Sequence, residues 1–147
     1  VSGAGARAIE ELRDQTKEVS AGRKAEPDVF KHQIAFNVIP HIDKFEDNSY
    51  TREEMKMQKE GRRILHLPNF RASVTCVRVP VYRAHSVAVS AEFDKPVDIP
   101  SARAAIKQFP GVQVADDPDN FVYPMPIDCA GKDDCFVGRL RKDCAFD

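Results

Sequence analysis

The segments Ala72-Ser-Val-Thr-Cys-Val-Arg-Val-Pro-Val81 and Ser86-Val-Ala-Val-Ser-Ala-Glu-Phe93 decide the fold that the sequence predicts. The first segment is rich in β-branched residues and apolar on both faces, which indicates a buried strand. The second alternates apolar and polar residues, which indicates a neighbouring strand. The two segments are separated by the short run from Tyr82 to His85, so we expect a hairpin and an antiparallel pair.

Helices and strands alternate irregularly along the rest of the chain. We expect helices over 4–19, 51–65 and 100–109, short strands over 34–39, 112–115 and 136–140, and loops over 20–32 and 116–134. Ser2 is the expected N-cap of the first helix, and Thr51 with Glu54 forms a capping-box pattern at the second. Gly61 lies inside that second helix, where it suggests close packing. The prediction is an α+β fold: a mixed, largely antiparallel sheet with helices packed on one face.

Composition excludes several classes of function. The chain has 147 residues, 22 basic and 23 acidic, with a net charge of −1. This balance gives no pull towards nucleic acid or an anionic membrane. No apolar run approaches the ~18 residues of a membrane-spanning helix, and no signal peptide is present, so we expect a cytoplasmic protein.

The cysteines and histidines do not predict a metal site. Cys76, Cys129, Cys135 and Cys144 lack the spacing of zinc ligands, and no histidine lies near the last three. Reduced thiols are expected, while a bridge from Cys129 to Cys144 is the alternative in an oxidising compartment. The chain begins at Val and ends soon after Cys144, so we expect residues 1–147 to be one domain truncated near both ends.

Arg78 is the first candidate functional residue. It lies in the middle of an apolar segment, where an unpaired guanidinium would be very costly, so an anionic partner is expected. An internal carboxylate would make the pair structural. A substrate carboxylate or phosphate would make it functional, because the planar guanidinium suits both groups. The residues alone do not choose between these hypotheses.

His85 is the second candidate. A hairpin centred near residues 81–82 would place position 85 about opposite Arg78, and paired positions bring side chains to ~5 Å. A single histidine is more often a surface or core residue. A histidine beside a buried arginine is a better candidate for a general acid–base, because the imidazole pKa usually lies near neutrality.

Two further patterns suggest anion binding. Glu53 and Lys56 lie three residues apart at the start of a helix, where they share one face; alone they would be an ordinary surface pair. The run Ser2-Gly-Ala-Gly-Ala6 precedes another helix, and its glycines would let a ligand approach the backbone. This run lacks the G-x-G-x-x-G spacing and is a weak signal by itself.

Taken together, these residues resemble the aspartate-semialdehyde dehydrogenase family over nearly the whole chain. The resemblance rests on motifs in the family's order and approximate spacing: Val1-Ser-Gly-Ala-Gly-Ala6, Phe36-Asn-Val-Ile-Pro40, Glu53-Glu-Met-Lys56 and Arg78-Val-Pro-Val-x-x-x-His85-Ser86. The chain looks like the C-terminal catalytic and dimerisation domain of that family, similar to the C-terminal domain of glyceraldehyde-phosphate dehydrogenase.

The resemblance implies a reaction and a role for each candidate residue. Family members reduce L-aspartyl 4-phosphate to L-aspartate 4-semialdehyde with NADPH, releasing phosphate, in the biosynthesis of lysine, methionine and threonine. By resemblance, Arg78 binds the substrate's α-carboxylate, Glu53 its amino group and Lys56 its phosphate, while His85 is the acid–base. Ser2, Gly3, Ala4, Gly5 and Ala6 match backbone beside the nicotinamide of NADP. A homodimer or homotetramer is implied.

The chain also departs from the family's pattern. The family's nucleophilic cysteine lies upstream, and none of the four cysteines here occupies its motif. The orienting glutamine, the nucleotide-binding domain and the final helix are also missing, so the 147-residue chain by itself is expected to be inactive. Two alternatives remain: a non-catalytic assembly module, or a relative of N-acetylglutamyl-phosphate reductase. The Glu53-Glu-Met-Lys56 motif argues against the second.

Overall fold

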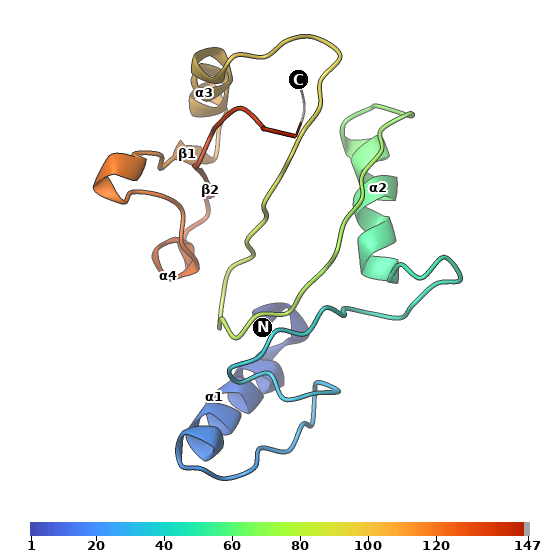
Figure 1. The fold of residues 1–147 in the computed structure, drawn as a ribbon, viewed down its shortest axis with the longest axis vertical. Coiled ribbons are helices and arrows are strands. Elements are labelled where there is room, and N and C mark those ends of the chain that lie inside the picture. The colour runs from blue at the N-terminus through green and yellow to red at the C-terminus, as the bar shows by residue number, and fades with distance from the viewer. Residues whose placement is uncertain (146–147) are drawn as a thin grey trace. The chain divides into compact units, whose positions relative to one another are not determined.

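The computed structural model describes residues 1–145, which form two compact units. The first runs from Val1 to Tyr82, and the second begins at Arg83. Helices α1 and α2 belong to the first unit, and α3, α4 and both strands belong to the second (Figure 1). Among the described residues, none of the helices combines the length and the apolar character needed to span a membrane.

The first unit begins with a 3₁₀ turn, η1 (Ser2–Ala4), followed by helix α1 (Ala6–Ser20). The predicted helix is confirmed, but the predicted N-cap is wrong. Gly5 occupies that position, with φ 91° and ψ 178°, and Ser2 lies inside the preceding turn. Glycine is suited to this backbone conformation because other residues rarely adopt a φ of that size.

One face of α1 packs against the loop that follows it and forms the hydrophobic core of this unit. The buried apolar residues in contact are Ala8, Leu12, Phe30, Ile34, Ala35 and Ile39. The predicted strand over 34–39 is wrong, because only Ile39 forms a β-bridge and Phe36 adopts a φ of 57°. The N–H groups of Ile34 and Ala35 donate to the Gln15 side chain instead of to a neighbouring strand.

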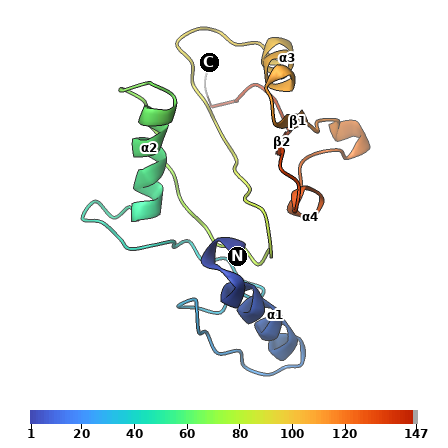
Figure 2. The same cartoon turned by 180° about the vertical axis from the view of Figure 1, so that it is seen from behind.

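Helix α2 (Arg52–Ile64) begins with the predicted capping box. Thr51 accepts from the Glu54 N–H, and the Glu54 side chain accepts from the Thr51 N–H. After the helix the chain turns back and runs alongside it (Figures 1 and 2). The predicted close packing at Gly61 is confirmed, because a Cβ atom there would lie 2.7 Å from the ring of Phe70.

The segment 72–81 is extended but belongs to no ladder in the described residues. Its one β-pairing is an antiparallel bridge between Ile39 and Arg78. Burial alternates from Ala72 to Val79: even-numbered side chains are half-buried and odd-numbered ones are exposed. The predicted burial of both faces is therefore wrong, because no chain covers the face that carries Val77 and Val79 in this unit.

The second unit begins with a segment that has no regular structure. Residues 86–93 are exposed and belong to no strand, so the predicted strand there is not observed. Helix α3 (Ile99–Gln108) follows, capped by Asp98, as predicted for 100–109. Strands β1 (Val112–Val114) and β2 (Cys135–Val137) then pair in parallel.

This pair is the only sheet in the part of the chain that the structure describes, so a largely antiparallel sheet is not observed. Parallel pairing requires a long crossover, and here the connection contains η2 (Pro118–Asn120) and α4 (Pro126–Cys129). The predicted strand over 136–140 is shorter than expected, because Arg139 adopts a φ of 58° directly after it.

Asp116 holds this second unit together. Its side chain is buried, pairs with Arg103, and accepts the backbone N–H groups of Arg139 and Leu140. Burial by itself raises the pKa of Asp116, but the bonds from Arg139 and Arg103 outweigh it and leave the pKa below its usual value. The acid therefore stays charged and fixes the chain after β2 against the chain after β1.

The contact between Gly61 and Phe70 gives a test of the fold. Gly61→Ala places a Cβ against the ring, and overpacking of this kind costs ~1–3 kcal/mol, whereas the better helix propensity of alanine returns only about 1 kcal/mol. We expect a lower free energy of unfolding in a urea titration, despite the loss of a helical glycine. Glu60→Ala, on the exposed side of α2, is the control and should change it by less than ~0.5 kcal/mol. An increase for Gly61→Ala would contradict the packing described here.

Candidate functional site

Arg78 is held at two points and leaves its charge unpaired. Its N–H donates to the carbonyl of Ile39 at 2.8 Å, and its carbonyl accepts from the Ile39 N–H at 3.0 Å. Its guanidinium lies 5.1 Å from the centre of the Phe30 ring. Within residues 1–145 no carboxylate forms an ion pair with it. The internal partner of the structural hypothesis is absent from this part of the chain, which favours an external anion.

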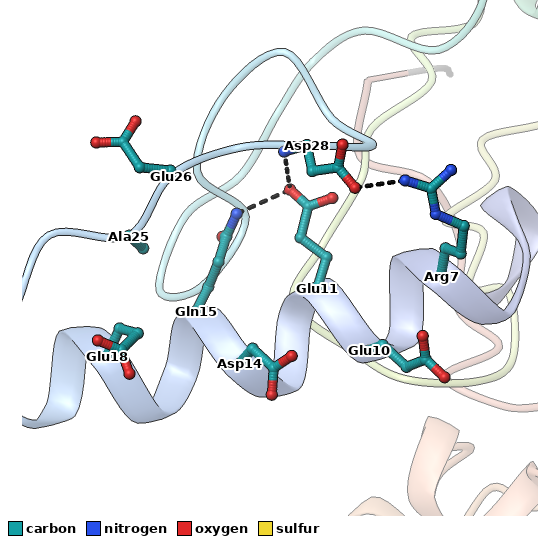
Figure 3. A pocket seen from close by; sticks show the side chains of 9 residues that line it. All are labelled: Arg7, Glu10, Glu11, Asp14, Gln15, Glu18, Ala25, Glu26 and Asp28. Atoms are coloured by element: carbon teal, nitrogen blue, oxygen red, sulfur yellow. Dashed lines mark hydrogen bonds and ion pairs between the residues drawn. The ribbon is translucent and has the colours of Figure 1, made fainter.

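Glu11 holds the loop that carries Phe30. Its carboxylate is buried and accepts the backbone N–H groups of Asp28, Val29 and Phe30 at 3.1, 2.6 and 3.3 Å. Figure 3 shows this side chain reaching from α1 to the loop, with Gln15 directed at the same carboxylate. The Glu11 carboxylate in this hollow already accepts hydrogen bonds from the backbone, so it has a structural role and is not free for a ligand. The ring beneath Arg78 is fixed by hydrogen bonds as well as by the core.

Glu53 and Lys56 form an ion pair on the first turns of α2. The Lys56 Nζ lies 3.1 Å from the Glu53 Oε2, and the two side chains are 49% and 37% exposed, respectively. The hydrogen bond and the charge of Glu53 raise the pKa of Lys56. An exposed pair of this kind is worth at most ~1 kcal/mol, so a ligand with two opposite charges can replace it at small cost.

Glu54 connects that helix to the Arg78 segment. It is buried, and its second oxygen accepts the backbone N–H of Cys76 at 2.9 Å. The N–H groups of Thr51 and then Cys76 lower the pKa of Glu54, so it stays ionised. Burial, followed by the charges of Glu54 and then Glu53, raises the pKa of the Cys76 thiol.

These contacts bring three of the predicted residues into one neighbourhood. The charge of Glu53 contributes to the raised pKa of Cys76. Cys76 and Arg78 lie two residues apart, so they share one face of the extended segment. Lys56 is paired with Glu53. A carboxylate, an ammonium and a guanidinium are therefore presented from the start of α2 and from the segment beside it.

The run Ser2–Ala6 is fixed against the end of the same segment. The Ser2 N–H donates to the Tyr82 carbonyl at 3.1 Å, and the Val1 nitrogen donates to the Val81 carbonyl. Helix α1 has no side-chain cap, and nothing lies within 4 Å of the position of a Cβ on Gly5. Open space beside a helix N-terminus without a side-chain cap leaves its backbone N–H groups accessible to a polar or anionic group.

His85 lies in the second unit and is exposed. The chain bends at Tyr82 and Arg83, and Ala84 adopts a φ of 72° directly before it. The pairing of position 85 with Arg78 stays a prediction. Among the described residues, no three His, Cys, Asp or Glu side chains are grouped so as to hold a metal ion, and all four cysteines are free thiols.

Phe30 and Glu11 are not predicted from the sequence, and the sequence pattern assigns Glu54 only a capping role. Phe30 carries no local signal, because its contact with Arg78 joins residues far apart in the chain. Glu11 gave a weak one: an acidic residue on the same helical face as Ala8 and Leu12 must find donors when that face is buried.

The whole chain, residues 1–147, matches the family described as "Semialdehyde dehydrogenase, dimerisation domain". The chain belongs to this family. It is 50% identical to aspartate-semialdehyde dehydrogenase of Aquifex aeolicus, over 100% of this chain and 44% of the relative. The Bacillus subtilis enzyme of the same name is 46% identical, over 97% of this chain and 44% of the relative. The chain thus spans less than half the length of these semialdehyde dehydrogenases.

Solved structures agree with the family assignment. The crystal structure of aspartate semialdehyde dehydrogenase II from Vibrio cholerae gives a TM-score of 0.88 at 38% identity, covering 99% of this chain and 43% of that one. A second structure of that enzyme, described as complexed with ASA, gives 0.85 at the same identity and coverage.

The environment of Cys76 in this semialdehyde dehydrogenase domain predicts a slow thiol. Because burial and two carboxylates raise its pKa, less thiolate is present at pH 8, and we expect iodoacetamide to label Cys76 at least about tenfold more slowly than exposed Cys135. Mass spectrometry of tryptic peptides over a time course measures both rates. Equal rates in the folded protein, with Cys76 as fast as in urea, would contradict the environment described.

Proposed function

We propose that the chain is the substrate-binding and dimerisation domain of an NADP-dependent aspartate-semialdehyde dehydrogenase. The enzyme would reduce L-aspartyl 4-phosphate to L-aspartate 4-semialdehyde and release phosphate, a step of amino-acid biosynthesis in the cytoplasm. The family assignment supports this class of activity, and the site residues support the substrate. The nucleophilic cysteine and most of the nucleotide site would lie outside this chain, which alone would show no turnover.

The unpaired Arg78 is the observation that carries the proposal. Arg78 is half-buried and has no carboxylate partner in residues 1–145, so its guanidinium is available to an anion from outside the unit. The centre of the Phe30 ring lies 5.1 Å from the guanidinium carbon as a cation–π contact, and a carboxylate would bind the planar guanidinium through a bidentate bond. Arg78 would therefore fix the α-carboxylate and place the far end of the substrate for reaction.

The Glu53–Lys56 pair supplies the other two charges. An amino-acid phosphate carries an ammonium and a phosphate, so each would replace one member of the existing ion pair. Glu53 would receive the ammonium and Lys56 the phosphate. Each charged group of the ligand would take the place of one side chain of the pair, so neither Glu53 nor Lys56 would be left without a partner.

His85 would move protons during the reaction, as general acid and base. Its exposure leaves the imidazole accessible to a substrate. When bound, NADPH supplies the hydride. Ser2, Gly3, Ala4, Gly5 and Ala6 would border the nicotinamide end, since the Gly5 position is open and the helix behind it is uncapped.

In the whole protein we further propose that residues 72–81 and 86–93 are strands of a mixed, largely antiparallel sheet with helices on one face. The alternating burial from Ala72 to Val79 supports this, because it is the pattern of a strand with one covered face. A homodimer or homotetramer would cover the exposed face, in keeping with the family's dimerisation domain.

The role of Arg78 is tested by Arg78→Ala in the full-length enzyme. Loss of a bidentate, charge-assisted contact should lower kcat/KM by about 10²–10³-fold, mainly through a higher KM for the semialdehyde. Steady-state kinetics in the phosphorylating direction measure both constants. Arg71→Ala, which replaces an exposed arginine directly before that segment, is the control and should resemble the parent enzyme. An unchanged KM for Arg78→Ala would show that Arg78 does not bind the substrate.

The role of His85 is tested by His85→Ala in the same enzyme. Removal of a general acid–base should lower kcat by about 10²–10⁴-fold with little change in KM. The limb of the pH–rate profile that belongs to the imidazole should also disappear. His32→Ala, another exposed histidine, should keep the parental kcat and profile. A parental rate for His85→Ala would exclude the proton-transfer role.

A further inference from the structure

Glu54 makes more hydrogen bonds than its helix cap requires. The capping box uses its backbone N–H, which donates to Thr51 Oγ1 at 3.3 Å, and its Oε2, which accepts from the Thr51 N–H at 2.7 Å. The remaining oxygen, Oε1, accepts the N–H of Cys76 at 2.9 Å, from a segment 22 residues away. This third bond adds nothing to the cap, so it has another structural effect.

That effect is to attach α2 to the chain beside it. Three α2 side chains spaced four residues apart bind the neighbouring backbone: Glu54 at Cys76, Gln58 at the N–H of Ala72 (3.3 Å), and Arg62 at the carbonyl of Phe70 (2.8 Å). Residues four apart share one helical face, so these form a row. The bound positions run backwards along the segment, which is therefore antiparallel to the helix. Glu54 is the last bond of the row before Arg78.

The position of Glu54 matters because of its neighbours. Glu53 directly precedes Glu54 in α2, and Lys56 follows it by two residues. Arg78 follows Cys76, whose N–H Glu54 accepts, also by two residues. Of the three bonds in this row, the one from the Cys76 N–H to Glu54 is therefore the one nearest both the start of α2 and Arg78. The α-carboxylate and α-ammonium of a substrate lie on one carbon, so a displacement of about 1 Å here would move one of them away from its partner.

We infer that Glu54 is a positioning residue that holds Arg78 in place relative to Glu53, so that the α-carboxylate and the α-ammonium of one substrate can bind Arg78 and Glu53 together. The inference rests on the proposed function. It assigns Glu54 no contact with substrate: the carboxylate acts only through the two N–H groups that it accepts. Replacement by glutamine keeps the shape but turns one of the two acceptors into a donor facing an N–H group.

The test uses the full-length enzyme and a double-mutant cycle. Glu54→Gln should raise the KM for aspartate semialdehyde about tenfold, with kcat changed less than about threefold, because binding geometry rather than chemistry is lost. In the Arg78→Ala background, Glu54→Gln should raise KM no further, since a distance to a missing group no longer matters. A purely structural role for Glu54 would give effects that add in the two backgrounds, and additive effects overturn the inference.

Two matched variants separate positioning from capping. Thr51→Ala removes the hydroxyl acceptor of the cap and leaves the bond to Cys76, so it should lower the melting temperature while KM stays within about twofold. Glu60→Gln, an exposed glutamate on the same helix, should change neither. If Thr51→Ala raises KM as much as Glu54→Gln does, the effect is one of helix stability and the inference is wrong.

A shorter carboxylate gives a second, independent variant. Glu54→Asp keeps both acceptor oxygens and the charge, so it should fold, but it draws the segment towards the helix by one methylene. A raised KM that vanishes in the Arg78→Ala background supports the inference, and a parental KM overturns it. If Arg78→Ala alone leaves KM unchanged, the proposed function fails first, and the cycle shows this separately.

Discussion

Backbone N–H groups that leave water must find acceptors, and the first unit has no sheet to supply them. Side chains of helices α1 and α2 accept these hydrogen bonds instead. Glu11 and Gln15 of α1 accept N–H groups of the loop over 28–35, and Glu54 and Gln58 of α2 accept those of the segment over 72–76. Each helix thus holds an irregular or extended piece of chain in register. Together with the hydrophobic core, these bonds position the chain around Arg78.

Two buried carboxylates, those of Glu11 and Glu54, hold the parts of the chain that contact or precede Arg78. Glu11 fixes the loop whose Phe30 ring lies against the guanidinium. Glu54 fixes Cys76, two residues before Arg78 on the same face. A flexible arginine held in this way loses little further conformational freedom when it binds an anion, so more of the electrostatic attraction remains as affinity. Neither carboxylate neutralises Arg78, since both are already occupied by backbone donors.

Local rules predicted the helices well. The capping box at Thr51 and the glycine at position 61 are signals within a few residues, and both have the expected consequence in the structure. The strands were predicted less well, because a strand exists only with a partner and the partner is not encoded locally. Residues 72–81 have the composition of a strand, yet the one residue that forms a bridge pairs with Ile39, far back in the chain.

The same distinction applies to the candidate site. Charge and spacing made Arg78, Glu53 and Lys56 candidates, because an apolar environment and a helical repeat can be recognised directly in a sequence, but only the family resemblance gave them roles. The contacts that position them, such as the ring of Phe30 and the second bond of Glu54, join residues 48 and 22 positions apart, respectively. Because of these contacts, Arg78 is held more firmly than the Glu53–Lys56 pair. The guanidinium of Arg78 lies near the Phe30 ring and its backbone pairs with Ile39, whereas the Glu53–Lys56 pair is an exposed contact. Under the proposed function, the ligand would exchange this one ion pair for two while Arg78 sets its orientation, and the low cost of the exchange in each direction would suit a ligand that must also leave.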